Sequence, residues 1–522
     1  MKYRHDLFST ATRTFLLSLP LALPLAACSD DAGSTDTDPT SETGDGDGDA
    51  SGDGDGDTAG DGDGDTAGDG DGDTTGDGDG DTEPDPNFPN CSCDQFEGDC
   101  TQASTAEEIL IAANSLEDGG TLVIGLGHIE LDNQVTIRAE NATVCGQGMG
   151  TEGSFDEGTV LDFASQQTQS NGIDAVGDNF TVRDLAIVDA KKDGLRVEDS
   201  SYVTIQRVRA TWRDEDNPDN GAYGLYPVKV THVLMEDSEA YNSADAGIYV
   251  GQCQHAIIRN NIAKGNVAGI EIENTQYADV YGNLAEDNTG GLLIFDLPGN
   301  PIIGHDVSVH DNVVINNNRS NFAPGGTVRQ IPPGTGTFAM ASRRVEIFNN
   351  TYENNNSSDI VLLSGLVIEG DPTAWEVTEE ELVGDVENCE LPTGDGVYYN
   401  YETNNILVHG NTHSGSGTNP YNATPDQEFG VLIGILYAGN LPVDNVLYDT
   451  LGESAFDTMD PGGNSNDNSL CIGENDAGTF ASLNVEVTQG GGDIDSLFRP
   501  AAPFTPFDCT QLDMGPIVPP EM

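Results

Sequence analysis

Three consecutive segments of the chain begin with a glycine followed by Ile or Leu, at a constant distance from one another. Gly247, Gly269 and Gly291 open these segments, and they are 22 residues apart both times. Each segment alternates apolar and polar residues over a few positions, which is typical of a β-strand and too short for a helix. A chain that repeats one short unit in this way forms a solenoid, because a single unit cannot bury its own apolar side chains.

The repeat extends in both directions and contains a second motif. Similar runs begin at Gly172, Gly194, Gly224, Gly336, Asp359 and Gly430. Within each period an alternating segment ends in asparagine, at Asn261, Asn283, Asn312, Asn350 and Asn411, and the first four of these are followed five residues later by Asn266, Asn288, Asn317 and Asn355. Glycine and asparagine accept the tight or left-handed conformations that corners require. Equivalent asparagines in stacked turns are therefore expected to hydrogen-bond along the stack.

Stacking such turns about 4.8 Å apart pairs every strand with its copy above and below. Inward Ile, Val and Leu then form one continuous core. Ahead of the repeats, residues 106–114 predict a short amphipathic helix, and an open solenoid end needs such a cap over its strand edges. Leucine-rich repeats are the alternative architecture, but the leucine spacing and helical segments that they require are missing from the sequence.

The period near 22, the glycine-led runs and the corner asparagines resemble the right-handed parallel β-helix of pectate-lyase-like proteins. The resemblance covers most of residues 105–440. It implies an all-β fold, a single-stranded right-handed parallel β-helix with a short N-terminal capping helix. We expect the β-helix to occupy residues 91–440, followed by C-terminal coils and a capping region in residues 441–522.

The first 27 residues read as a lipoprotein signal peptide, with basic residues, an apolar stretch and then small residues. Leu25-Ala26-Ala27-Cys28 resembles the bacterial lipobox. This resemblance implies export, a lipid on Cys28 and attachment to the cell envelope, at the outer membrane or the cell surface. A plain secretory signal with an incidental cysteine is the alternative.

Acidic residues dominate the rest of the chain. Residues 29–90 hold 22 Asp or Glu and no Lys or Arg, mostly in Gly-Asp octads, which predicts a solvated tether over residues 28–90. The alternating Asp pattern also resembles calcium loops, although the closing Glu of an EF-hand is missing. Residues 91–522 hold 67 acidic and 16 basic residues, which excludes nucleic acid as a partner. We expect a monomer that contacts the membrane only through its lipid.

Eight cysteines remain after Cys28, and an exported chain can oxidise them. Three lie at the start of the body and two near its end, so disulfide staples are expected at both ends. A metal site from Cys91, Cys93 and Cys100 is the alternative, although the spacing is not that of zinc ligands. Cys145 and Cys253 lie within apolar or repeat segments and are expected in the core.

Alternation within each glycine-led run sorts its residues into two faces. Ile270 and Ile272 face the core, so Glu271 and Glu273 face outward. The same register in every coil gives an outward strip of three columns: Asp174, Arg196, Tyr226, Tyr249, Glu271 and Leu293; Glu198, Val228, Gly251, Glu273 and Phe295; and Asp199, Lys229, Gln252, Asn274 and Asp296. Aromatic and polar groups on one strip suit a polysaccharide or another extended surface ligand. The long segments 212–223 and 317–336 are expected to flank the strip.

A polysaccharide lyase or epimerase is the first functional hypothesis for this strip. It needs a base near a sugar carbon, and Lys229, Tyr226 and Glu271 are the candidate catalytic residues. Substrate binding is predicted for Arg196, Tyr249, Gln252 and Asn274. Calcium held by Glu271, Glu273 and Asp296 is the candidate cofactor, because it reconciles an acidic protein with a uronate substrate.

Several alternatives stay open. Paired carboxylates on the strip also suit a hydrolase. A non-catalytic module that binds glycan or protein, a structural spacer and an ordinary solvated face explain the same residues. Mannuronan-type epimerases of this fold carry an Asp-Pro-His-Asp signature, and the nearest segment here, Tyr226-Pro227-Val228-Lys229, shares only the proline. No catalytic residue of that family therefore transfers to this chain.

Overall fold

The computed structural model describes residues 90–522 except 152, 155–156, 392, 395, 421–427, 451–465 and 484–496. The expected signal peptide, Cys28 and almost all of the expected tether lie outside the described residues. Within the described ranges, no helix is both long and apolar enough to cross a membrane.

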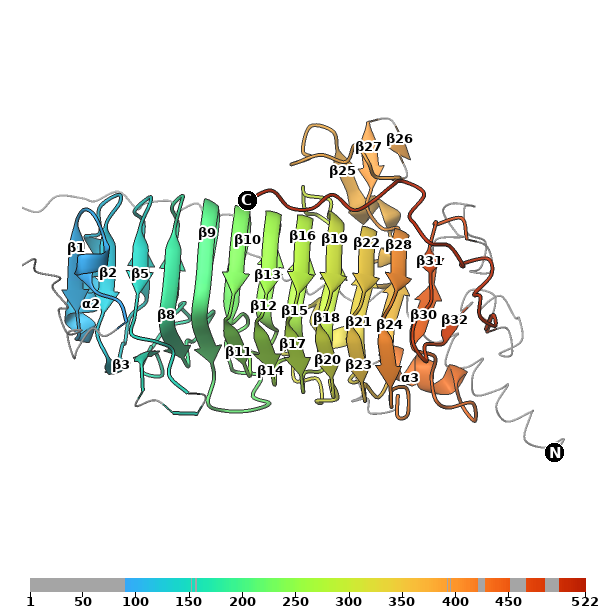
Figure 1. Cartoon of the computed structure of the whole chain (residues 1–522), viewed down its shortest axis with the longest axis horizontal. Coiled ribbons are helices and arrows are strands. Elements are labelled where there is room, and N and C mark those ends of the chain that lie inside the picture. Colours follow the sequence, from blue (N-terminus) through green and yellow to red (C-terminus); the bar gives the residue numbers. More distant parts are fainter. Residues whose placement is uncertain are drawn as a thin grey trace, which may run out of the picture. The chain divides into compact units, whose positions relative to one another are not determined.

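Parallel strands stack in three rows, so that each coil contributes one strand to each row (Figure 1). Row A contains the glycine-led runs: β4 (Val135–Ile137), β7 (Ile173–Ala175), β12 (Ala246–Gly251), β15 (Ala268–Glu273), β18 (Gly290–Phe295), β21 (Thr335–Met340), β24 (Ser358–Leu363), β30 (Val446–Asp449) and β32 (Phe480–Ser482). Row B contains β1 (Cys100–Ala103), β2 (Thr121–Ile124), β5 (Thr143–Cys145), β13 (Gln254–Arg259), β16 (Gln276–Tyr281), β19 (His305–His310), β22 (Arg343–Phe348), β28 (Asn404–His409) and β31 (Cys471–Ile472).

Row C contains β3 (Gly127–Glu130), β6 (Thr159–Asp162), β11 (Glu239–Tyr241), β14 (Ile262–Lys264), β17 (Leu284–Glu286), β20 (Val313–Ile315), β23 (Thr351–Glu353) and β29 (Thr412–Ser414). Three longer strands turn a corner and belong to more than one row: β8 (Thr181–Val188), β9 (Leu195–Thr211) and β10 (Leu225–Glu236). The 22-residue repeat is therefore one coil, as its period predicts.

The register of row A follows the glycine-led runs. Ile248 pairs with Ile270, and Ile270 pairs with Leu292. These side chains point into the lumen and belong to one continuous apolar core that extends from α2 (Ala106–Asn114) to the last strands. The predicted all-β solenoid with an apolar lumen is confirmed.

Asparagine ladders run along two corners, as expected. In the first ladder the main-chain N–H and the Nδ2 of each asparagine donate to the Oδ1 of the next, at 2.9–3.2 Å. Its members are Asn261, Asn283, Asn312, Asn350, Asn411 and Asn475. Asn266, Asn288, Asn317 and Asn355 form the second ladder in the same way. The ladders satisfy buried corner amides that no strand partner reaches.

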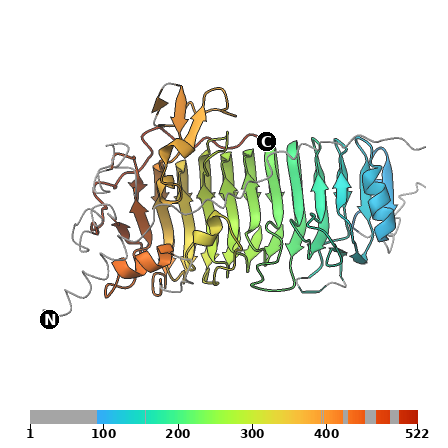
Figure 2. The ribbon, with the colours of Figure 1, turned by 180° about the vertical axis from the view of Figure 1, so that it is seen from behind.

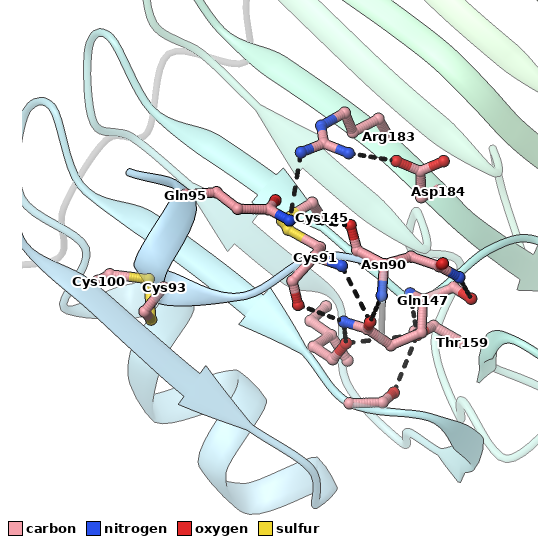
Figure 3. The surroundings of a disulfide bond; sticks show 12 residues. Asn90, Cys91, Cys93, Gln95, Cys100, Cys145, Gln147, Thr159, Arg183 and Asp184 are labelled. Atoms are coloured by element: carbon pink, nitrogen blue, oxygen red, sulfur yellow. Dashed lines mark hydrogen bonds and ion pairs between the residues drawn. A yellow bond between two sulfur atoms is a disulfide. The ribbon is translucent and has the colours of Figure 1, made fainter. Parts of the chain in front are cut away.

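The N-terminal end is capped by the predicted helix and by two disulfides. Helix α2 begins after Thr105, whose side chain forms a reciprocal capping box with Glu108. Cys93 bonds Cys100, and Cys91 bonds Cys145. Figure 3 shows Gln147 fixing the Cys91 segment: its Nε2 donates to the Cys91 carbonyl at 2.9 Å, and its Oε1 accepts the Cys91 N–H at 3.1 Å.

At the other end, Cys471 bonds Cys509, so staples at both ends are confirmed. Cys253 is a free, fully buried core residue, as expected. Cys145 is also buried, but it is one half of a disulfide and not only a core residue.

Two excursions interrupt the later coils. Residues 364–403 leave the coil through two 3-10 helices, η3 (Gly365–Val367) and η4 (Pro372–Trp375). They then form a small antiparallel sheet that projects from the coils (Figure 1), built from β25 (Glu376–Thr378), β26 (Thr393–Gly394) and β27 (Val397–Tyr399).

The prediction of a coil at Gly430 is wrong. This segment forms helix α3 (Glu428–Leu436), which lies near the end of the stack opposite α2 (Figure 2). The reason is its pattern: residues 429–437 are apolar almost without alternation, and such a run fits a buried helix as well as a strand.

Candidate functional site

Row A places the three predicted columns in register. Asp174 pairs with Arg196, Arg196 with Tyr226, and Tyr249 with Glu271. All of these side chains point away from the lumen, as the alternation predicts. The outward strip therefore exists as one surface of the coil stack.

The strip faces outward from the lumen, but it is not open to solvent along its whole length. Tyr249, Gln252, Glu271, Glu273, Asn274 and Asp296 are each at most 8% exposed. A second apolar cluster lies outside the lumen and joins outward strand residues such as Leu293 and Phe338 to Ile331, Trp375 and Ile433. These covering residues come from segment 317–336, from the 364–403 excursion and from α3. The cover forms because the strip carries large apolar side chains that would otherwise face water.

The strip stays open over its earlier coils, where five charged side chains form an ion ladder: Arg138, Asp174, Arg196, Glu198 and Lys229. Arg138 follows β4, Asp174 lies in β7, Arg196 and Glu198 lie in β9, and Lys229 lies in β10. The contacts alternate in sign over four successive coils, at 2.6 Å, 2.7 Å, 3.3 Å and 3.7 Å. The terminal cations are the accessible ones, because the Arg138 and Lys229 side chains are 52% and 39% exposed.

Charge pairing sets the protonation of the ladder. Burial opposes ionisation of Asp174, but hydrogen bonds and charge from Arg138 and Arg196 hold its pKa below the ordinary value. Burial likewise lowers the pKa of Arg196. The charges of Asp174 and Glu198, together with the hydrogen bond to Asp174, outweigh burial, so the Arg196 pKa is raised. The two central members of the ladder, Asp174 and Arg196, are therefore both ionised at neutral pH.

Next to the ladder lies a tyrosine–carboxylate cluster, formed by Tyr223, Tyr226, Tyr249, Glu271 and Glu273. The ring centroids of the three tyrosines are 4.5–4.9 Å apart. Burial raises the pKa of Tyr249 well above its ordinary value, and the nearby charges of Glu273 and Glu271 add to this. The Tyr249 phenol therefore stays protonated over the whole neutral range.

Gly251 explains how the phenol ring of Tyr249 reaches this position. A Cβ on Gly251 would lie 2.2–2.5 Å from Cε1, Oη and Cζ of Tyr249. The ring therefore lies over the backbone of Gly251, which pairs with Glu273 in the next coil. A larger residue at position 251 would displace the ring from this position.

Asp193 is a functional candidate that the sequence reasoning missed. It is 1% exposed, and neither carboxylate oxygen has a hydrogen bond of ordinary geometry. Burial raises its pKa to about 6, against the charges of Lys192 and Arg196 and the Tyr223 main-chain amide. A carboxyl group with this pKa can accept or release a proton near neutral pH. It was missed because it comes just before the Gly194 run, where alternation assigns no face.

The two predicted flanking segments border this region and touch each other. Arg319, in segment 317–336, contacts Asp216 at 2.7 Å and Glu215 at 3.5 Å, both in segment 212–223. Its Nη2 also contacts Asp287, in the corner after β17, at 2.7 Å. Arg319 thus joins both segments to the coil beneath them.

The predicted calcium ligands do not fit a cation well in this geometry. The carboxylate of Asp296 is paired with Arg343 Nη1 at 2.7 Å and accepts the Gly304 N–H at 2.8 Å. Glu273 accepts from Asn300 at 3.3 Å. In the described part of the chain, no three His, Cys, Asp or Glu side chains are grouped to hold a metal ion. Calcium binding by Glu271, Glu273 and Asp296 stays a prediction without support from their present contacts.

A second set of surface residues was also missed, although the sequence carries a signal for it. Tyr281, His310, Phe348 and His409 stack along row B with ring centroids 4.7–5.3 Å apart. His310 contacts Asp279 and His409 contacts Glu346, each at 2.9 Å. Each ring lies two residues before a ladder asparagine, so the repeated motif marks the position.

A match to a protein-family model agrees with this architecture. A family model for the right handed beta helix region matches residues 193–371. The A-module of mannuronan C-5 epimerase AlgE4 from Azotobacter vinelandii shares 17% identity and a TM-score of 0.43, covering 73% of this chain and 92% of that chain. DFA-IIIase from Arthrobacter chlorophenolicus A6 shares 11% identity and a TM-score of 0.42, covering 72% and 90%.

An alginate lyase from Paenibacillus sp. str. FPU-7 shares 12% identity and a TM-score of 0.29, covering 60% of this chain and 95% of that chain. No curated protein sequence matches this chain. The chain is a right-handed parallel β-helix protein.

Proposed function

We propose that this β-helix binds an extended polysaccharide along the ion ladder. The observation that carries the proposal is the alternation of cations and carboxylates over four successive open coils. A polymer of repeating units can meet equivalent groups in each coil. Guanidinium and ammonium groups donate to sugar oxygens, and carboxylates accept from sugar hydroxyls.

The composition of the ladder favours a hydroxyl-rich chain over a densely charged one. Two carboxylates, Asp174 and Glu198, lie between the three cations. A polyanion laid along the ladder would meet the Glu198 carboxylate, which is 22% exposed, and would pass close to the Asp174 carboxylate, which is 2% exposed, and like charges at close range oppose binding. A neutral chain, or one with widely spaced uronates that meet Arg138 and Lys229, avoids this repulsion.

Lys229 is the residue to test, because the chain offers a matched control. The Lys229 side chain is 39% exposed and lies 3.7 Å from Glu198, whereas Lys264 on row C is 41% exposed and lies 3.4 Å from Glu286. We expect Lys229→Gln to weaken polysaccharide binding about tenfold, the loss expected for one charge-assisted hydrogen bond. Lys264→Gln should bind like the wild type.

Binding is measured by affinity electrophoresis of the full chain in gels that contain neutral or uronate polysaccharides. Equal loss in the two variants would show that the ladder is not the binding face. Absence of retardation by every polysaccharide in the panel would contradict the proposal as a whole.

Catalysis is a second candidate function, favoured by the tyrosines beside the ladder. Tyr226 precedes Lys229 by three residues on β10, and its ring contacts Tyr223. In a lyase or epimerase reaction, a base removes the proton on the carbon next to a uronate carboxyl group. In a lyase, the glycosidic oxygen on the next carbon then leaves, takes up a proton to become a hydroxyl group, and a double bond forms. In an epimerase, return of a proton to the opposite face inverts the carbon. Glu271 is 2% exposed, so in this arrangement it would position Tyr249 without touching sugar.

Tyr226→Phe separates the two functions. If the protein is a lyase, this variant should bind polysaccharide normally and produce no unsaturated ends, measured by their ultraviolet absorbance. Epimerisation is followed by the change in the sugar proton spectrum. Unchanged product formation in Tyr226→Phe would remove Tyr226 from the reaction.

We also propose that the protein is exported and anchored by a lipid on Cys28. The three disulfides support export, because such bonds persist in oxidising compartments. Radiolabelled palmitate fed to expressing cells should enter the wild type and not Cys28→Ser. Equal labelling would contradict the anchor.

A further inference from the structure

One outer corner of the coil stack carries a column of residues in the left-handed conformation. Its members are Tyr202, His232, His255, Tyr277, Asp306 and Arg344, with φ between 52° and 63°. The first four are stacked aromatic rings, with centroids 4.3–4.9 Å apart. We call these six residues the corner column.

The last residues of the chain lie along this column. Figure 1 shows the C-terminal segment running back over the ends of the row B strands. Arg344 donates to the carbonyls of Met514 at 3.1 Å and Pro516 at 2.7 Å. Asp306 accepts the Val518 N–H at 2.7 Å, and Nδ1 of His255 accepts the Glu521 N–H at 3.1 Å.

These contacts hold the segment by its main chain. The side chains of Val518 and Met522 are 39% and 57% exposed, so they add little burial. Residues 514–518 of the C-terminal segment are held by an ion pair: Arg344 and Asp306 contact each other at 2.8 Å and keep their charges over a wide pH range. The end of the segment, at Glu521, depends instead on one neutral imidazole nitrogen of His255.

We propose that residues 519–522 form a latch that His255 holds at neutral pH and releases on acidification. The Glu521 N–H donates to Nδ1, so Nδ1 has no proton while the latch is closed. Protonation of His255 puts an N–H on Nδ1, so that this N–H and the Glu521 N–H are two donors that face each other without an acceptor. The contact is then lost, whereas the Val518 contact to Asp306 persists.

The surroundings of His255 lower its pKa and so favour the neutral form that accepts the Glu521 N–H. Burial and the neighbouring ring of His232 lower its pKa, against the charges of Glu521 and Asp385. Tyr277 stacks on the other side of the ring, and its hydroxyl donates a hydrogen bond to Asp385 at 2.8 Å. Because the pKa is lowered in the closed state, closure is complete above the ordinary histidine value of about 6.5 and is lost as the pH falls through the lowered value.

Release of the latch would uncover aromatic rings. The hydrogen bonds of residues 514–521 to Arg344, Asp306 and His255 do not reach the next two members of the corner column, His232 and Tyr202. Tyr202 is 53% exposed. Opening of residues 519–522 extends this exposed aromatic edge over His255. The latch therefore couples pH to the size of an aromatic surface on row B.

Amide hydrogen exchange of the full chain tests the latch. Protection of the Glu521 and Val518 amides is measured between about pH 8 and pH 5, each relative to a free peptide of residues 511–522 at the same pH. We expect Glu521 to lose protection about fivefold at the acidic end, the factor for one neutral hydrogen bond. Val518 should keep its protection.

Two variants assign the effect to His255. His255→Asn places a non-titrating acceptor near the position of Nδ1, and asparagine accepts the left-handed conformation. It should protect Glu521 at both pH values, whereas His255→Phe should protect it at neither. Protection of Glu521 that is independent of pH in the wild type would overturn the latch. A pH effect that persists in His255→Asn would overturn the role of His255.

Discussion

The first asparagine ladder makes a quantitative prediction at Asn312. The Asn312 side chain accepts the main-chain N–H and the Nδ2 of Asn283, both at 3.0 Å, and donates to Val280 O and to Asn350 Oδ1, both at 2.9 Å. Asn312→Ala deletes these four hydrogen bonds. The Asn283 N–H then remains buried without its side-chain acceptor, because Asn283 is 1% exposed.

The expected loss follows from these contacts. An orphaned buried donor costs about 1–3 kcal/mol, and each further lost hydrogen bond costs about 1 kcal/mol or less. We therefore expect Asn312→Ala to lower the free energy of unfolding by about 3–5 kcal/mol. Asn312→Asp keeps the acceptor and loses the two donors, so it should cost less.

Equilibrium urea unfolding of the full chain, followed by circular dichroism, measures this difference. The matched control is Asn133→Ala, because Asn133 is exposed and its side chain bonds only the neighbouring Asp132. The control should lie within about 0.5 kcal/mol of the wild type. A loss below about 1 kcal/mol in Asn312→Ala would refute the reasoning, since the corner would then tolerate an unsatisfied amide.

Three other predictions follow from separate features. Cys91→Ser opens a bridge between residues 54 apart, so unfolding should become easier by about 4 kcal/mol in urea titrations; an unchanged midpoint would mean that Gln147 alone fixes this cap. Gly251→Ala should displace the Tyr249 ring, with altered near-ultraviolet circular dichroism and a loss of about 1–3 kcal/mol, whereas Gly325→Ala, which has open space around its Cβ, should change neither signal. The lowered pKa of Asp174 stabilises the fold above the ordinary carboxyl value of about 4, and this contribution is lost as the pH falls through the lowered value. Unfolding of Asp174→Asn should therefore depend less on pH in acid than that of the wild type, and equal acid dependence would contradict this.

Periodicity was enough to predict the coil register. In a solenoid the residues that contact each other are one period apart, so the contacts can be predicted directly from a regular repeat in the sequence. Ile248, Ile270 and Leu292 stack because they occupy the same place in successive units. The asparagine ladders were predictable for the same reason, and the capping helix was predictable from its amphipathic pattern and short length.

The cover over the strip was not predictable in the same way. The covering residues Ile331, Trp375 and Ile433 come from excursions that have no counterpart in other coils, so no period relates them to the strip. Leu293 and Phe295 did carry a signal, because two large apolar residues at outward positions need a partner. The charged residues beside them were predicted to face solvent from alternation alone. Alternation separates residues that face the lumen from residues that face away from it, but it does not show whether another segment covers the outward face.

The place where the cover ends also defines where the proposed polysaccharide ligand could reach the strip. Each covering segment inserts after β20, β24 or β29 and folds over row A from there, whereas the coils from β4 to the start of β10 have no insertion of their own on that face except segment 212–223. The ion ladder lies on these coils, and its exposed cations Arg138 and Lys229 mark the two limits of the open surface. The same cover that buries Glu271 and Glu273 excludes water from the tyrosine–carboxylate cluster, which strengthens the electrostatic effect of those carboxylates on Tyr249. The proposed ligand would therefore lie in water at the Arg138 end of the ladder and reach a buried tyrosine cluster at the Lys229 end. This boundary at Tyr223 and Tyr226 is what distinguishes the proposed site from an ordinary solvated face.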